Sequence, residues 1–182
     1  CLLSTQAALR GGAGLVTVAT APENPMRLAA AAPEAMWLPL ETDEAGFLRS
    51  SDQNRKTLEK QLSRANAVLL GCGLGVTEET RRLVHWVLEQ AVCPVVLDAD
   101  GLNCAVSCIE LSRRTGKDWI LTPHPGEMAR LTGRSIPQIQ ENRVETATQF
   151  AAAYPVTLAL KGAGTLVAQG SRLAQNPTGN PG

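Results

Sequence analysis

The chain has 182 residues, a length suited to one domain with its own hydrophobic core. Its 17 basic and 17 acidic side chains balance to a net charge of zero, and only 3% of the residues are aromatic. This composition argues against a protein that binds nucleic acid or an anionic membrane. The five cysteines form no Cys-x-x-Cys pair, and the sequence contains neither a membrane-spanning apolar run nor a signal peptide. We therefore expect free thiols and a cytoplasmic protein.

In chain order, the residue pattern predicts helices that alternate with short strands. The expected elements are a helix over 2–10, a strand over 15–20, a short helix with irregular structure over 22–52, a helix over 57–66, a strand over 67–70, a helix after Thr77, strands over 94–97 and 119–121, helices over 127–131 and 135–153, and strands over 156–160, 165–168 and 172–174. This alternation implies an α/β fold with a largely parallel sheet, helices on both faces and an antiparallel edge hairpin. We expect a single domain over 1–182, truncated at both ends.

A Gly-Cys-Gly-Leu-Gly sequence at 71–75 follows a predicted strand and precedes a predicted helix. Gly71, Gly73 and Gly75 let the backbone approach a ligand closely, and amides at a helix start bind anions. The spacing does not match the dinucleotide-binding Gly-x-Gly-x-x-Gly pattern, and a tight strand-to-helix turn explains the glycines equally well.

Two further strands end in polar side chains. Asp98 and Asp100 follow one of them, where paired carboxylates bind a hydrated magnesium ion or substrate hydroxyls; Asp100 is equally suited to capping the next helix. His124 follows the other, between two prolines that stiffen its loop and favour contact with a ligand. We interpret Glu127 as a residue that braces the following helix, and His85 as structural.

The sequence Lys-Gly-Ala-Gly-Thr at 161–165 joins two predicted strands. It supplies a cation, flexible backbone and a hydroxyl within five residues, the groups needed to bind a nucleotide phosphate or ribose. It is not a Walker A loop, because its spacing differs and no helix follows.

Taken in order, six motifs resemble the ADP/ATP-dependent NAD(P)H-hydrate dehydratase family, a branch of the ribokinase-like superfamily. They are Gly-Gly-Ala-Gly-Leu-Val-Thr-Val at 11–18, the turn at 71–75, Asp-Ala-Asp-Gly-Leu-Asn at 98–103, Thr-Pro-His-Pro-Gly-Glu at 122–127, Leu-Lys-Gly-Ala-Gly-Thr at 160–165 and Thr-Gly-Asn-Pro-Gly at 178–182. The resemblance covers nearly the whole chain and implies a ribokinase-like fold. It also implies a hydro-lyase reaction that repairs hydrated NADH or NADPH: the new hydroxyl is phosphorylated by ADP, and the phosphate then leaves.

The resemblance also assigns candidate site residues and partners. The residues expected to contact the hydrated dinucleotide are Gly71, Gly73, Gly75, His124, Asp100 and Asn103, and those expected to contact the adenine nucleotide are Lys161, Gly162, Ala163, Gly164 and Thr165. Mg²⁺ and ADP, or ATP, are the expected cofactor and co-substrate, and no side chain is assigned as a metal ligand. Family analogy further suggests a homo-oligomer and an upstream epimerase domain.

The chain departs from the family pattern in two places. Cys72 stands where family members usually have proline, which loosens the turn. The family's Gly-Gly-x-Gly-Asp segment, whose aspartate acts as the catalytic base, would follow residue 182, so no catalytic residue is assigned here. We expect this 182-residue piece to have little or no turnover by itself.

Two other functions remain open from the sequence. A ribokinase-like kinase of a small alcohol or vitamin precursor would use the same scaffold and stop at the phosphate ester. A non-catalytic nucleotide-binding module would bind AMP without chemistry.

Overall fold

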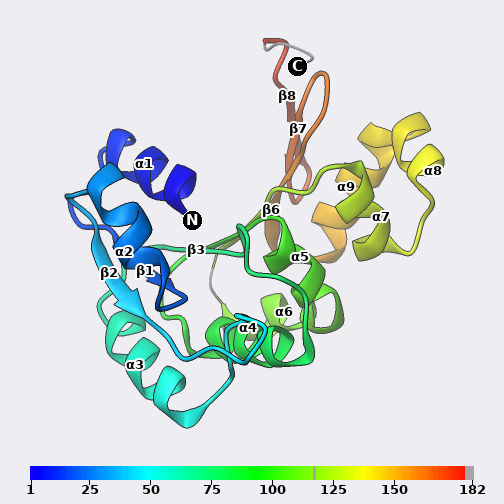
Figure 1. Ribbon diagram of the computed structural model, residues 1–182. Helices are drawn as coiled ribbons and strands as arrows, with labels where there is room; N and C mark the ends of the chain where they lie inside the picture. Colours follow the sequence, from blue (N-terminus) through cyan, green and yellow to red (C-terminus); the bar gives the residue numbers. More distant parts are fainter. Residues whose placement is uncertain (117, 179–182) are drawn as a thin grey trace.

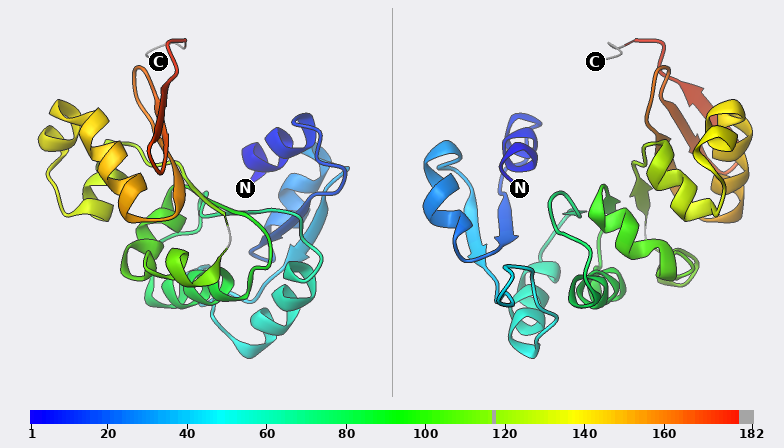
Figure 2. Two further views of the ribbon diagram at one scale, coloured as in Figure 1. Left: turned by 180° about the vertical axis from the view of Figure 1, so that it is seen from behind. Right: turned by 45° about the vertical axis from the view of Figure 1, so that its right-hand side comes forward.

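The computed structural model describes residues 1–116 and 118–178, which form two sheets flanked by helices (Figure 1). The smaller sheet pairs β1 (Thr17–Thr20) with β2 (Met36–Pro39) in parallel. The larger sheet has the order β3-β4-β5-β6-β7-β8. Its strands are β3 (Val68–Leu70), β4 (Val95–Leu97), β5 (Trp119–Leu121), β6 (Val156–Leu160), β7 (Leu166–Gln169) and β8 (Arg172–Gln175). Figure 2 shows the β1–β2 pair as a separate unit beside this sheet.

Strands β3 to β6 are parallel, whereas β7 is antiparallel to both β6 and β8. The predicted mostly parallel sheet with an antiparallel edge hairpin is therefore confirmed. Because parallel strands end at the same edge, the turns that follow β3, β4, β5 and β6 lie along one side of the sheet. These four turns contain the motifs singled out in the sequence.

The connections of the described residues are mainly helical. The α-helices are α1 (Leu2–Arg10), α2 (Asn24–Leu28), α3 (Asp52–Leu62), α4 (Glu78–Gln90), α5 (Asp100–Ala105), α6 (Leu111–Thr115), α7 (Pro125–Thr132), α8 (Ile136–Glu141) and α9 (Arg143–Ala153), with 3-10 turns η1 (Ala29–Ala31) and η2 (Val106–Cys108). None of the helices in the described ranges is long and apolar enough to cross a membrane.

The main core lies against one face of the larger sheet. Alternate residues of β4, β5 and β6 are buried, and the register places these residues side by side, as with Val95, Trp119 and Val156. This period of two is the pattern of a strand with one well-covered face. Helix α9 is part of that core and packs on β6 and β7. The core thereby fixes the four strand ends relative to one another.

The structure differs from the predicted elements in several places: helices α5 and α6 are not in the predicted set, and three further differences have a recognisable cause. Residues 36–39 form strand β2, although their residue pattern predicts irregular structure. Pairing with β1 stabilises this short strand, whose intrinsic pattern is weak. Helix α3 begins at Asp52 instead of residue 57, since the hydroxyl of Ser51 accepts a hydrogen bond from the Asn54 amide and caps it. The single helix expected over 135–153 is broken at Asn142, whose ψ of 47° is not helical.

Candidate functional site

The turn at 71–75 is packed backbone against backbone. A Cβ atom on Gly71, whose φ is +126°, would collide with the carbonyl oxygen of Asp98 and the backbone of Gly101. Gly73, with φ +75°, faces open space instead. The amide of Leu74 donates to the Gly71 carbonyl at 3.2 Å, which closes the turn. Gly71 is therefore required by close contact, and Gly73 by its backbone conformation alone.

Asp98 and Asp100 lie beyond the end of β4 and have different partners. Asp98 Oδ1 accepts a hydrogen bond of 2.6 Å from Lys161 Nζ. Asp100 Oδ2 accepts from the Gly75 amide at 2.8 Å and makes no cap bond to its own helix, so the capping alternative is wrong. Between them Ala99 has φ +50°, the only positive φ outside glycine among the described residues. Because Ala99 adopts this strained conformation, the carboxylates of Asp98 and Asp100 both lie at the same edge of the sheet, although only one residue stands between them.

His124 caps helix α7 and is braced by Glu127. Its Nδ1 accepts from the Gly126 and Glu127 amides at 2.9 and 3.4 Å, while Glu127 Oε2 accepts from the His124 amide at 2.8 Å. The bracing role predicted for Glu127 is confirmed. Since Nδ1 is an acceptor, the proton of a neutral imidazole is assigned to Nε2. The ring is half-exposed, and Nε2 lies 3.4 Å from Glu127 Oε1.

Lys161 joins the ends of β4, β5 and β6. Its amide donates to the Pro123 carbonyl at 2.8 Å, and its Nζ lies 4.0 Å from Glu127 Oε2 in addition to its bond with Asp98. Partial burial is the largest single effect and raises the pKa of Asp98. Hydrogen bonds from Lys161, Thr122 and the Ala99 amide, together with the charge of Lys161, outweigh it and hold that pKa below its ordinary value. His124 and Lys161 thus lie on the same edge of the sheet, both next to Glu127.

The turn at 161–165 is held by a residue that sequence reasoning missed. Arg143 Nη1 donates to the Ala163 carbonyl at 2.7 Å, and its Nη2 donates to the Leu160 carbonyl at 3.1 Å. Within the turn, Thr165 Oγ1 donates to the Gly162 carbonyl at 3.1 Å. The helix break at Asn142 that places Arg143 gave no recognisable signal in the sequence.

The remaining predicted site residues have structural partners. Asn103 Oδ1 accepts from Arg130 at 3.1 Å, and Gly164 packs against the side chain of Gln175. The structure therefore groups the turn at 71–75 with Asp98, Asp100, His124 and Lys161, and it places Asn103 against helix α7. In the last motif, residues 179–182 lie outside the described residues.

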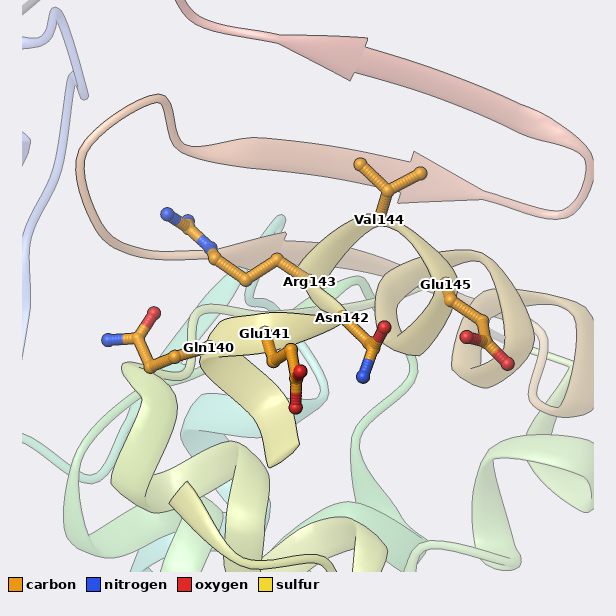
Figure 3. A pocket seen from close by; sticks show the side chains of 6 residues that line it. All are labelled: Gln140, Glu141, Asn142, Arg143, Val144 and Glu145. Atoms are coloured by element: carbon orange, nitrogen blue, oxygen red, sulfur yellow. The ribbon is translucent and has the colours of Figure 1, made fainter. Parts of the chain in front are cut away.

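Two open cavities among the described residues lie elsewhere. One of about 440 Å³ is lined by Gln140 to Glu145 at the break between α8 and α9 (Figure 3), and one of about 540 Å³ lies near Asp118 and Pro155 at the start of β5 and β6. Among the predicted site residues, none lines either cavity. We place the site by its chemistry, at the strand ends where parallel sheets bind ligands.

The described side chains do not form a ready-made metal centre. Within residues 1–116 and 118–178, no three His, Cys, Asp or Glu side chains converge to hold an ion. Asp98, the carboxylate closest to Lys161, is already paired with that ammonium. Any Mg²⁺ at this edge would need ligands from a bound nucleotide.

Comparison with known proteins gives a consistent result. The family model for NAD(P)H-hydrate dehydratase matches residues 1–182. The chain is 39% identical over 181 residues to the bifunctional NAD(P)H-hydrate repair enzyme Nnr of Moorella thermoacetica, covering 99% of this chain and 34% of that protein. It is 34% identical over 167 residues to an ADP-dependent (S)-NAD(P)H-hydrate dehydratase of Xanthomonas campestris, covering 92% of this chain and 55% of that protein.

Among solved structures, the chain resembles the ADP/ATP-dependent NAD(P)H-hydrate dehydratase of Bacillus subtilis co-crystallised with ATP and Mg²⁺. The TM-score is 0.73 at 30% identity, over 98% of this chain and 59% of that one. The predicted ribokinase-like α/β fold is confirmed. The chain spans between about a third and three fifths of the length of these three proteins.

Proposed function

The chain belongs to the NAD(P)H-hydrate dehydratase family, and from this premise we propose that it forms part of an enzyme that repairs hydrated NADH or NADPH. In the proposed reaction the ring hydroxyl attacks the β-phosphate of ADP, which releases AMP. The phosphate ester is then eliminated, and NADH or NADPH and inorganic phosphate result. The dependence on ADP is suggested by the name of the Xanthomonas campestris relative.

The observation that carries the proposal is the charge cluster of Lys161, Asp98 and Glu127 at the ends of three adjacent strands. Phosphoryl transfer depends mainly on positioning and on neutralisation of phosphate charge. Lys161 supplies a cation that is pre-positioned by Asp98, and the neighbouring turn supplies backbone amides. We propose that Lys161 to Thr165 bind the phosphates and ribose of the adenine nucleotide.

The turn at 71–75 and His124 are proposed to bind the hydrated dinucleotide. The open backbone at Gly73 leaves room for a ligand to approach. With Nδ1 engaged in the helix cap, the half-exposed Nε2 of His124 is proposed to donate to a ligand acceptor in place of the nearby Glu127 carboxylate. Asp100 is proposed to act indirectly, because its carboxylate holds the Gly75 amide. Asn103 is proposed to contact the dinucleotide from helix α5.

Each carboxylate described at this edge already has a partner, so we assign none of them as the base that removes the hydroxyl proton. The residues present do not fit a protein-held Mg²⁺ site, and no step above depends on that ion. The bifunctional name of the Moorella relative supports the further proposal that an epimerase domain accompanies this chain in the full-length protein. Assembly into a homo-oligomer stays a proposal by analogy.

The test uses the full-length protein with hydrated NADH, ADP and Mg²⁺. We expect NADH absorbance to rise together with equimolar AMP and phosphate. Lys161→Met should lower the rate by about 100-fold, because it removes the cation that faces the transferring phosphate. Lys60→Met, at an exposed position on α3, is the matched control and should leave the rate unchanged.

Two outcomes would contradict the proposal. Accumulation of a stable phosphate ester would indicate a kinase of a small alcohol instead. Binding of AMP with no conversion of hydrated NADH would indicate a nucleotide-binding module.

A further inference from the structure

Arg143 is the first residue of α9, and its side chain extends into the turn at 161–165, the bend that joins β6 to β7 (Figure 3). Besides its bonds to the Ala163 and Leu160 carbonyls, Nη2 lies 3.5 Å from the carbonyl oxygens of Lys161 and Gly164. A single guanidinium therefore gathers the carbonyl oxygens of four residues on one side of the bend. The planar fork of arginine suits this arrangement, because its five N–H groups point in fixed directions.

This grouping of carbonyls decides where the amides point. In a trans peptide the C=O and the following N–H point in opposite directions. Since the carbonyls of Lys161 and Ala163 face Arg143, the amides of Gly162 and Gly164 face away from it. Neither amide donates to an acceptor in the part of the chain that the structure describes. Two backbone donors of the bend are thus left open on its side away from Arg143.

The glycines of the bend are matched to the arginine. Gly162 and Gly164 have φ of +148° and +64°, values that other residues adopt only with strain. A Cβ atom on Gly162 would also lie only 2.9 Å from both terminal nitrogens of Arg143. The Lys-Gly-Ala-Gly-Thr sequence and Arg143 therefore form one unit, although 18 residues separate Arg143 from Lys161.

We propose that Arg143 is a positioning residue for the nucleotide phosphates. It holds the 161–165 bend so that the Gly162 and Gly164 amides and the Lys161 ammonium face one phosphate group, and it does not touch the nucleotide itself. Neighbouring backbone amides of a turn that face the same way form an anion-binding concavity. This inference rests on the proposed function, since it takes ADP as the ligand of the bend.

The experiment measures ADP and hydrated NADH binding to the full-length protein by calorimetry. We expect Arg143→Ala to weaken ADP binding by about tenfold or more, through loss of ordered phosphate contacts. Binding of hydrated NADH should stay unchanged, whereas a general structural defect would weaken both ligands. Arg143→Lys should behave much like Arg143→Ala, because an ammonium lacks the planar fork.

Arg134→Ala is the matched control. Arg134 also donates to α9, at 3.1 Å to Thr146 and 2.7 Å to Gln149, but within the described residues it makes no hydrogen bond to the bend. We expect it to change ADP affinity by less than about twofold. Should Arg143→Ala fail to fold, Arg143→Lys, which keeps the charge and most of the volume, carries the test.

The outcomes separate this inference from the proposed reaction. Equal ADP affinity in the parent and in Arg143→Lys and Arg143→Ala would overturn the role of Arg143 and leave the reaction intact. A parent protein that binds ADP but restores no NADH would refute the reaction, while the effect of Arg143 on ADP binding would still support its positioning role.

Discussion

The turns at 71–75 and 161–165 both follow a parallel strand and both contain glycines with positive φ, yet they are held in different ways. The first is fixed at its start by backbone packing, with Gly71 against Asp98 and Gly101, and only its last amide, at Gly75, is bound by a side chain, that of Asp100. The second is fixed by the side chain of Arg143, which reaches in from a helix. Where backbone packs against backbone, as at Gly71, no space remains for the Cβ atom of another residue. The side chain of Arg143, by contrast, can be shortened by substitution without pushing the strands apart. We therefore expect substitutions in the first turn to affect the fold, and substitutions around the second to affect mainly ligand binding.

The largest effect is expected at Gly71. Gly71→Ala places a Cβ against the backbone of Asp98 and Gly101 and should lower the free energy of unfolding by about 3 kcal/mol or more, through overpacking and an unfavourable φ. Gly73→Ala is the control, because its φ of +75° lies close to the left-handed helical region and a Cβ there meets open space, so it should cost about 1 kcal/mol. Denaturant unfolding of both variants measures the difference. Equal losses would show that close packing does not distinguish this turn.

An intermediate effect is expected at Asp98, which links the two turns through its carbonyl at Gly71 and its carboxylate at Lys161. Because its folded pKa is lowered, Asp98 stabilises the fold above its unfolded pKa of about 3.9, and this contribution is lost as pH falls through the folded value. Asp98→Asn should therefore be less stable than the parent by about 1 kcal/mol near neutral pH.

The difference between the parent and Asp98→Asn should shrink as the pH is lowered below about 4. Unfolding free energies measured across this pH range check the expectation. A difference that stays constant with pH would mean that the ion pair with Lys161 does not stabilise the folded chain.

The smallest effect is expected at Cys72. The Leu74–Gly71 hydrogen bond and the φ of +75° at Gly73 are typical of a type II turn, which favours proline at the position of Cys72. The Cys72 amide has no acceptor among the described residues, so Cys72→Pro loses no backbone bond. We expect a gain of about 0.5 kcal/mol from reduced freedom of the unfolded chain. A measured loss of stability would show that the turn has another geometry.

The polar turns were predictable because their signals are local. A buried apolar run followed by glycine, proline or aspartate marks a strand end within a few residues, as at Leu121 before His124. The bracing of His124 by Glu127 was recognisable for the same reason, since the two residues lie within one helical turn. Strand β2 was not predictable, because its stability comes from pairing with β1 and not from its own residues.

Long-range partners were beyond the reach of residue patterns. The Asp98–Lys161 pair joins residues 63 apart in sequence, and nothing near Arg143 indicates that it binds the bend after β6. The same holds for Asp100, for which the sequence left capping open and the structure shows a bond to Gly75. In each case a polar side chain had several possible local partners, and packing of the sheet selected a distant one.

The amino-acid sequence by itself determined most of the order of strands and helices, the glycines and prolines at the strand ends, and the family resemblance that these motifs carry. Only the tertiary structure decided which charges meet and which amides remain open. Local backbone preferences act over a few residues, whereas hydrogen bonds between strand ends depend on the register of the whole sheet.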